Sequence, residues 1–505
     1  MTAAAGPLRP AALVNRLEGV RLALGRRFTV EDRLAGIRTR LDDDRTTVDV
    51  FVQPVGERVG FGVENYLHYG NLRIEEGAGG VDVFHRGKRR VRWRRVVETS
   101  WTRPALRGVA GDRNVYREAN VVLDDRVVTL IARSEPSGRL AESLLWELAD
   151  SVEPIRSDAR AGADEMVIDA SDVPVPMPEG PAATREIVHR GGGLELRIPP
   201  GRLVWGAYTP WVPFGKQWTE PLLDVERIVG HRFELLMEYQ RCDAHAADVA
   251  DALVRTRDDG RLLLLSFQPF MPGSDEILVP AFIEGRFDDQ VREYGRLLRD
   301  VGAPVFVRFA NEMNGDWVRW CAWWLSKDAD LWVTAWKRFR RLLLEEGAHN
   351  CIFVWNPHDR SMPNFKWNSA HVYWPGDEEV DWVGLTGYNN GIGTPGGVWR
   401  ELDEIYRPVY DDYRARYPTK PFVITEFASH EDGGRKDEWI RRGLPSLARN
   451  YPQIRAAVWW NAIDDTWLYE IGSSESAREA FAEAMRDPLL ARSTVRRLAV
   501  GEEKP

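Results

Sequence analysis

The sequence predicts an α/β protein, a (β/α)8 TIM barrel preceded by a smaller α+β domain. Three observations support this prediction. The chain has 505 residues, more than a single hydrophobic core usually holds. Of its 21 tryptophans, 18 follow residue 200, so the two parts of the chain differ in kind. Beyond residue 200, short apolar runs also recur at the spacing of βα units.

Eight apolar runs mark the strands of the barrel, which is expected to occupy residues 199–490. Successive runs begin about 30 to 46 residues apart, and amphipathic stretches lie between most of them. An open doubly wound sheet is the rival interpretation, but it usually has fewer strands and begins with a Gly-rich phosphate loop, which is not found here. The runs lie at 203–208, 232–240, 261–267, 304–312, 351–356, 381–388, 421–427 and 456–461.

The α+β accessory domain is expected to span residues 1–154. Its first 40 residues are expected to be helical, because four apolar residues recur at helical spacing, namely Leu13, Leu17, Val20 and Leu24. Short runs between 47 and 134, among them NLRIEE at 71–76, predict an antiparallel sheet, and a leucine-rich helix ending at Pro154 closes it.

Residues 155–198 are rich in Asp, Ala, Pro and Gly and predict a linker, and residues 491–505 predict a tail. Because all eight runs lie beyond the linker, the barrel is expected to have a complete core of its own and to fold without the first domain.

The distribution of charge argues against a nucleic-acid partner. Residues 1–200 contain 30 Lys+Arg and 30 Asp+Glu, so the net charge of -9 belongs to the Trp-rich part. Binding nucleic acid requires clustered positive charge. Acidic residues together with many aromatics suit neutral carbohydrate, because indole faces stack on sugar rings while carboxylates bind hydroxyls. Core packing is the alternative role for many of these tryptophans.

One basic segment, HRGKRRVRWRR at 85–95, stands out in the first domain. As a continuous strand it would place Lys88, Arg90, Arg92 and Arg94 on one face. Such a face could hold an anionic polymer or a membrane surface. The alternative, favoured by the zero net charge of residues 1–200, is a solvated face balanced by nearby acids.

The remaining composition predicts neither a metal nor a cofactor. Cys242, Cys321 and Cys351 form no CxxC pair, so neither a disulfide framework nor a cysteine zinc site is indicated. No transmembrane segment is expected, because no apolar stretch approaches 18 residues. The N-terminus lacks the apolar run of a signal peptide, which predicts a cytoplasmic protein; a trimmed start would make the same sequence that of a secreted one. Oligomeric state is left open.

Two glutamates end apolar runs where barrel chemistry is expected. Glu312 ends the fourth run and Glu426 the seventh, and active sites of such barrels lie at the carboxyl ends of the strands. A structural glutamate paired with arginine is the alternative for each. Placed at strands four and seven, the two carboxylates could approach within about 5 to 5.5 Å, as a double-displacement glycosidase requires. Glu426 would then be the nucleophile and Glu312 the acid/base, and Arg308 is the expected cation beside the nucleophile.

The segment RFANEMNGDWVRW at 308–320 resembles the acid/base segment of glycoside hydrolase family 26, the β-mannanases and their relatives. Five further segments resemble strand ends of that family in the same order: WGAYTPWVP, MEYQ, VYWPGDEEVDWVGLTGYN, KPFVITEFAS and AVWWNA. The resemblance covers about 200–490. It implies a retaining endo-β-glycosidase that needs no cofactor, with Glu312 as acid/base and Glu426 as nucleophile.

The resemblance also implies a set of substrate-binding residues. Trp317 and Trp320 match aromatic residues lining the sugar subsites, Tyr388 matches the tyrosine that binds the nucleophile, and Trp460 matches the platform under the cleaved sugar. Alternation along the strand allows only one of Trp459 and Trp460 to face the site. Trp323, Trp324, Trp332 and Trp336 lie on or beside a helical stretch and are expected to pack.

Two polar residues complete the predicted site. Asn311, beside the acid/base, is expected to bind the sugar 2-hydroxyl. His358, after the fifth run, is expected to line the cleft, with a loop role as the alternative. The family usually has histidine where this chain has Asn311, and relatives act on β-1,3-xylan and mixed-linkage β-glucan. The main hypothesis is hydrolysis of β-1,4-mannan; the alternatives are another of these β-glycans, or a barrel that binds carbohydrate without activity.

Overall fold

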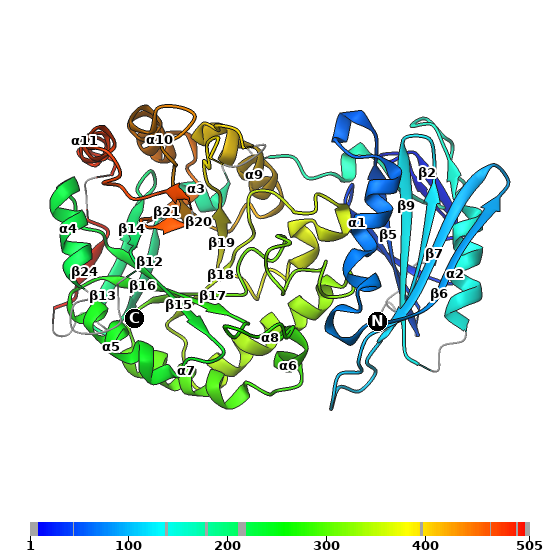
Figure 1. The fold of residues 1–505 in the computed structure, drawn as a ribbon, viewed down its shortest axis with the longest axis horizontal. Coiled ribbons are helices and arrows are strands. Elements are labelled where there is room, and N and C mark those ends of the chain that lie inside the picture. The colour runs from blue at the N-terminus through cyan, green and yellow to red at the C-terminus, as the bar shows by residue number, and fades with distance from the viewer. Residues whose placement is uncertain are drawn as a thin grey trace, which may run out of the picture.

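The computed structural model describes residues 9–43, 45–136, 140–176, 180–210, 219–393, 397–464, 466–490 and 493–499. The N-terminal domain and the barrel lie side by side (Figure 1). Residues 211–213 of the WGAYTPWVP segment and several residues of the predicted linker and tail lie outside the described part. Within it, none of the helices is long and apolar enough to cross a membrane.

Eight parallel strands close into a barrel, as predicted. All eight coincide with the apolar runs, because a strand buried on both faces reads as a short continuous run of apolar residues. The strands are β14 (Val204–Tyr208), β15 (Leu235–Arg241), β16 (Leu262–Gln268), β17 (Val305–Phe309), β18 (Cys351–Trp355), β19 (Trp382–Thr386), β20 (Phe422–Phe427) and β21 (Ile454–Trp460).

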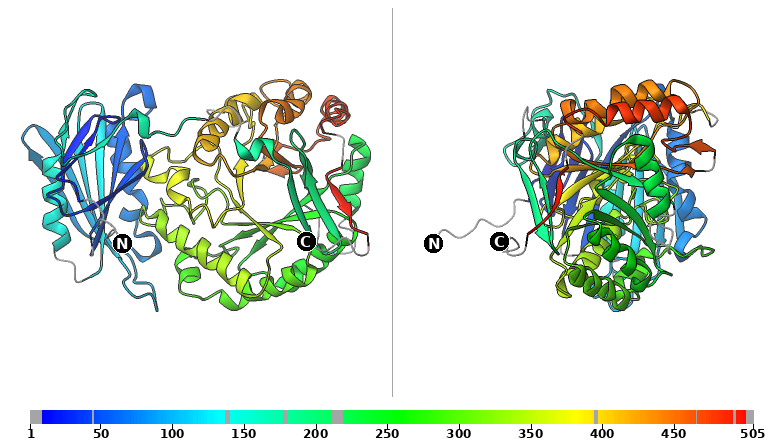
Figure 2. Two further views of the ribbon diagram at one scale, coloured as in Figure 1. Left: turned by 180° about the vertical axis from the view of Figure 1, so that it is seen from behind. Right: turned by 90° about the vertical axis from the view of Figure 1, so that its left-hand side faces the viewer.

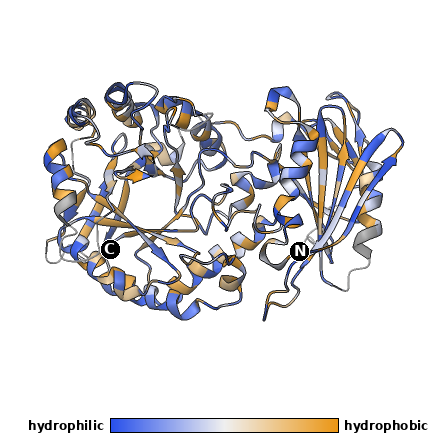
Figure 3. Ribbon diagram, in the orientation of Figure 1, coloured by the Kyte–Doolittle hydropathy of each residue, from blue (hydrophilic) through white to orange (hydrophobic). Residues whose placement is uncertain are grey.

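Helices surround the barrel and carry both polar and apolar residues (Figure 3). In α7 (Asp288–Val301) the buried residues Val291, Tyr294, Leu298 and Val301 recur every three or four positions, and Gly302 ends the helix with φ 69°. The other helices of eight residues or more in this domain are α4 (Thr219–Val229), α5 (Ala246–Asp258), α8 (Ala329–Glu345), α9 (Leu402–Arg416), α10 (Lys436–Asn450) and α11 (Glu475–Ala484).

The N-terminal domain is built on a seven-stranded antiparallel sheet in the order β3-β4-β5-β9-β8-β7-β6. Helix α1 (Val63–Glu75) lies between this sheet and the barrel, and α2 (Leu140–Ser151) covers the other face (Figure 1). The strands are β3 (Thr29–Leu34), β4 (Arg38–Asp42), β5 (Thr46–Pro54), β6 (Asp82–Val91), β7 (Arg94–Thr102), β8 (Val115–Val122) and β9 (Arg126–Ser134).

Two predictions for this domain are wrong. Residues 9–40, the described part of the predicted helical region, are not helical: β1 (Ala12–Asn15) and β2 (Val20–Ala23) form a hairpin whose turn includes Gly19 at φ 68°, and β3 and part of β4 follow. Leu13, Val20 and Leu24, which recur at helical spacing, instead pack into one apolar cluster from the hairpin and the residue after it. Residues 71–76 are not a strand: Ile74 is buried one helical turn after Gly70 in α1.

The predicted linker and tail are partly incorporated into the two domains. Strand β11 (Met166–Ile168) pairs with β1 in the first domain. Strands β12 (Ile187–Gly191) and β13 (Leu194–Ile198) pair with each other, and β24 (Val495–Arg497), drawn in red in Figure 2, adds to them from the predicted tail. Because the Arg455 guanidinium at the start of β21 donates to the carbonyl of Ile198 at 2.6 Å, this small sheet belongs to the amino end of the barrel.

The basic segment is a hairpin and not one continuous strand. Arg92 lies in the turn between β6 and β7 with φ 56°, so the predicted face does not extend to Arg94. Arg89 pairs with Glu98, and Arg92 with Glu153. These ion pairs agree with a balanced, solvated face.

The two domains share a buried junction, so the apolar core of the barrel continues into the first domain. A single apolar cluster contains Phe51, Trp101 and Ile131 from the sheet and Trp323 from the barrel. Charged pairs are buried with it. The Lys327 ammonium donates to Glu118 Oε2 at 2.5 Å, and their side chains are 3% and 1% exposed. The connection between the domains is therefore a packed interface, not a flexible tether.

Candidate active site

Arg308 lies at the centre of the barrel and is fully buried. Its guanidinium donates to Ser266 Oγ at 2.6 Å, to Asn356 Oδ1 at 2.5 Å and to Glu426 Oε1. Burial is the largest single influence and lowers the pKa of Arg308, but the neighbouring groups, Glu426 foremost, together raise it above its usual value. The structure thus places a permanent cation against Glu426, where the sequence predicted one.

The second oxygen of Glu426 is held by Tyr388. The Tyr388 hydroxyl donates to Glu426 Oε2 at 2.6 Å, and its ring stacks on Tyr469 at 4.9 Å between centroids. Burial, with the charge of Glu426, raises the pKa of Tyr388 well above its usual value, so the phenol remains a neutral donor. Glu426 is 6% exposed and fixed from two directions, an arrangement that suits a preorganised nucleophile.

Glu312 lies in a different environment. Its backbone has φ 56° and its N–H donates to the carbonyl of Asn356 at 2.7 Å. A left-handed backbone costs energy in any residue other than glycine, and such strain concentrates at functional sites. The Trp317 indole donates to Glu312 Oε2 at 2.9 Å. Burial, followed by the negative charge of Glu426, raises the pKa of Glu312, so its protonated form is favoured.

An aromatic wall stands beside Glu426. Trp460 stacks on Tyr208 at 5.1 Å, and its indole donates to the Tyr239 hydroxyl at 3.2 Å. Trp459 is instead fully buried against Phe481 of α11, so alternation along β21 sends only Trp460 towards the site. Sequence reasoning did not single out Tyr208 or Tyr239. Tyr239 and Met237 are two residues apart on β15, so their side chains point to the same side, and Met237 contacts Arg308. The position of Tyr239 near the end of the second apolar run was the signal in the sequence.

Asn356 is another residue that sequence reasoning missed. Its side-chain oxygen accepts from both Arg308 and the Thr425 hydroxyl, and its carbonyl holds the backbone of Glu312. It therefore links the strands that carry the two glutamates. Its position as the last residue of the fifth apolar run was the local sign.

The two tryptophans predicted to line sugar subsites differ in their exposure to solvent. Trp317 is 47% exposed and packs edge-on against the His358 ring at 4.8 Å. Trp320 is 4% exposed, and its indole donates to the carbonyl of Asn311 at 2.7 Å. The prediction that Trp320 offers a face to substrate is corrected: with its ring buried and its N–H bound to backbone, it supports the loop from below.

The remaining predicted residues lie at the edge of the site. Asn311 is buried and its side-chain oxygen accepts from Gln268 at 3.1 Å, which directs its amide N–H groups elsewhere and leaves them as donors for a hydroxyl. His358 is partly exposed, and the charge of its imidazolium would lower the pKa of Glu312. Trp323, Trp332 and Trp336 are buried and pack, as predicted for the helical tryptophans, while Trp324 is partly buried.

The class of protein follows from this geometry. A (β/α)8 barrel presents two glutamates at strands four and seven, one paired with a buried arginine and one with a raised pKa, next to an aromatic wall, and this is the arrangement of a glycoside hydrolase.

Comparison with known proteins agrees with that class. Residues 282–410, which include Glu312, match the model of glycosyl hydrolase family 26. The match covers the middle of the barrel and confirms the resemblance of this chain to that family.

Individual relatives are distant. Endoglucanase H of Acetivibrio thermocellus is 25% identical over 279 residues, which is 54% of this chain and 30% of the relative. The chain thus spans less than a third of that relative's length. A GH26 β-mannanase structure from Bacteroides ovatus is 16% identical with a TM-score of 0.44, and covers 57% of this chain and 90% of its own. The structure of the Bacillus subtilis mannanase man26 is 16% identical with a TM-score of 0.40. It covers 57% of this chain and 85% of its own.

Proposed function

We propose that the protein is a retaining endo-β-glycosidase that hydrolyses β-1,4-mannan by double displacement. The observation that carries the proposal is the opposite electrostatic setting of the two glutamates. Arg308 and Tyr388 stabilise charge on Glu426, whereas burial and the charge of Glu426 hold a proton on Glu312. A retaining glycosidase needs this division of roles.

In the first step the Glu426 carboxylate attacks the anomeric carbon while Glu312 donates its proton to the departing glycosidic oxygen. The glycosyl–enzyme ester then forms on Glu426, and the negative charge that raised the pKa of Glu312 is lost. Glu312, now ionised, removes a proton from water, which attacks the anomeric carbon and releases the sugar with its original configuration. The Trp317 indole, which donates to Glu312 Oε2, stabilises the ionised form between the two steps.

The sugar being cleaved is expected to lie between Trp460 and Glu426. The wall of Trp460 and Tyr208 offers an aromatic face to the apolar side of the ring. The free amide donors of Asn311 are placed for the 2-hydroxyl, a contact that strengthens as positive charge develops at the anomeric carbon.

A second candidate substrate is β-glucan. Two observations favour it: Asn311 stands where the mannanases usually carry histidine, and the curated relative is an endoglucanase. Mannose and glucose differ in the configuration of the 2-hydroxyl, which is the group Asn311 is expected to meet. Measuring reducing ends released from mannan, β-1,3-xylan, mixed-linkage β-glucan and carboxymethylcellulose decides between these substrates.

The mechanism is tested with Glu426→Ala and Glu312→Ala. Each variant is expected to lower kcat by several orders of magnitude. Azide should rescue the first with inverted product and the second with retained product, and the second should spare substrates with good leaving groups. An inverted product from the unmodified enzyme, followed by proton NMR, would exclude double displacement. Near-native activity in both variants would remove the site assignment.

A further inference from the structure

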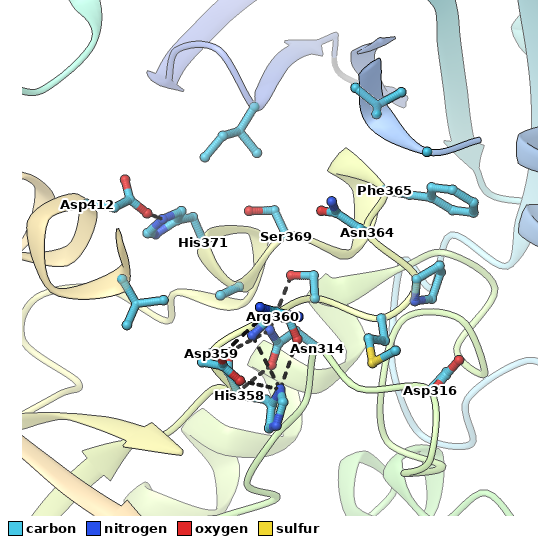
Figure 4. Close-up of a pocket in the computed structure, with 18 of the residues that line it drawn as sticks. Asn314, Asp316, His358, Asp359, Arg360, Asn364, Phe365, Ser369, His371 and Asp412 are labelled. Atoms are coloured by element: carbon cyan, nitrogen blue, oxygen red, sulfur yellow. Dashed lines mark hydrogen bonds and ion pairs between the residues drawn. The ribbon is translucent and has the colours of Figure 1, made fainter. Parts of the chain in front are cut away.

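A cavity of about 1020 Å³ lies between the N-terminal domain and the barrel (Figure 4). One wall comes from the N-terminal domain and includes Val59 and Asn65. The other wall comes from the loops that follow β17 and β18, and includes Asn314, His358 and Arg360. Its volume is at the upper end of the range for small-molecule sites. The cavity is therefore large enough for a ligand of more than one ring.

This cavity is connected to the acid/base Glu312 through the side chains of His358 and Trp317. Asn314 fixes the backbone of His358 through bonds of 2.8 and 3.1 Å. The His358 ring packs on Trp317, whose indole donates to Glu312. One side chain thus separates the cavity wall from the Glu312 carboxyl. Neither Glu312 nor Glu426 is among the lining residues, but the contacts of His358 and Trp317 lead from the cavity wall to Glu312.

Apolar side chains from both domains line this cavity. Val59 of the N-terminal domain is 38% exposed, and Met362 of the barrel is 47% exposed. Single exposed apolar residues are common on protein surfaces. Two that come from different domains and line one cavity beside a glycosidase site offer apolar contact to the faces of sugar rings.

The polar groups of the cavity leave hydrogen-bond donors free for the hydroxyls of a ligand. Its carboxylates are engaged: Asp316 accepts from the Tyr69 hydroxyl at 2.7 Å, and Asp412 binds His371 at 2.5 Å. Arg360 is 59% exposed, and its nearest carboxylate oxygen, on Asp359, is 3.8 Å away. The Arg360 guanidinium therefore keeps donors for a ligand.

We propose that this cavity binds the leaving-group part of a β-linked glycan, and that the N-terminal domain supplies one wall of that site. The inference rests on the proposed function. Glu312 protonates the oxygen of the departing sugar, so the departing chain must extend on the Glu312 side, where the cavity lies. The N-terminal domain then has a role in recognising the polymer.

The test compares substrates that reach the cavity with substrates that do not. Asn65→Trp fills the cavity from α1, and Arg360→Ala removes its cation. His68→Trp is the matched control, because His68 is exposed on the same helix but lines a different cavity. Mannohexaose and cellohexaose place sugars in the cavity, whereas 4-nitrophenyl β-mannobioside and β-cellobioside have only an aryl leaving group.

On the hexasaccharide that is cleaved, kcat/KM is expected to fall about three- to tenfold in Arg360→Ala, the effect of losing one or two bonds to hydroxyls. The fall should be at least as large in Asn65→Trp. The aryl glycosides and the His68→Trp control should stay within about twofold of the unmodified enzyme, the variation expected of surface changes.

Two results would overturn the inference. Unchanged rates on the hexasaccharide would mean that the cavity is not used. An equal loss on the aryl glycoside would mean that the variants act through the position of Glu312. If the unmodified enzyme cleaves neither series, the proposed function fails, and calorimetric titration of both hexasaccharides decides this inference separately. Binding that Asn65→Trp abolishes would support it, and absence of binding to the unmodified protein would refute it.

Discussion

Replacing Lys327 by methionine tests whether the domain junction depends on its buried ion pair. Lys327 lies in the loop that leads from Glu312 to α8. Its ammonium bonds Glu118 Oε2 at 2.5 Å and Asn71 Oδ1 at 2.9 Å. Burial lowers the pKa of Lys327, and Glu118 opposes that shift. The ion pair is therefore buried away from water, and the charge of Glu118 helps to keep Lys327 protonated.

The expected cost follows from the partner left behind. The Glu118 side chain is 1% exposed in the structure. Lys327→Met takes away its cation and leaves the amides of Asn71 and Asn120 as its donors. Removing one member of a buried pair costs about 3 to 5 kcal/mol of unfolding free energy. Lys327→Met with Glu118→Leu removes both charges but leaves the two amides without an acceptor, so we expect a loss of about 1 to 3 kcal/mol.

Urea unfolding followed by tryptophan fluorescence at neutral pH measures these losses, because most tryptophans lie in the barrel and around the junction. Lys337→Met, an exposed lysine on α8, is the matched control and should change stability by less than about 0.5 kcal/mol. The reasoning is refuted if Lys327→Met behaves like this control, or if the double variant is less stable than the single one.

Three further outcomes are expected. Tyr388→Phe removes a donor to the charged nucleophile and should lower kcat roughly 10- to 150-fold, measured on the best soluble oligosaccharide, while an unchanged kcat would deny the bond a role in catalysis. Trp317→Phe removes a bond that stabilises ionised Glu312, so the pKa of Glu312 should rise. Because the first step needs this group protonated, the alkaline limb of the kcat/KM profile should move to higher pH. A shift to lower pH would contradict the assignment. Deleting residues 1–194 should leave an insoluble or inactive barrel, since Lys327 and Asp328 lose their partners and an apolar face is exposed; a soluble fragment with full activity on a short oligosaccharide would show that the barrel is self-sufficient.

The errors in the N-terminal domain have a common cause. The helical spacing of residues 13–24 and the alternation in 71–76 are short patterns that two structures satisfy equally well, and tertiary packing chose between them. A clearer sign was present in β9. Its residues VVTLIA show no alternation of apolar and polar residues. Val127 and Ile131 face the barrel cluster, while Val128 and Leu130 face the cluster under α2. A sheet strand without alternation indicates cover on both faces, which here means a domain packed against the barrel.

The sequence by itself determined the barrel and the two glutamates, because strand periodicity is local and a carboxylate at the end of an apolar run lies at the barrel mouth whatever the loops do. Only the tertiary structure decided which loop tryptophan is exposed: Trp317 and Trp320 are three residues apart in one loop, and their burial depends on what packs beneath them. It also decided that residues 194–196 pair with 495–497, that Lys327 meets Glu118, and that a cavity lies between the two domains. Each of these contacts joins residues about 200 to 300 positions apart or surfaces of different domains, and their free energy arises from burial, which no local pattern records.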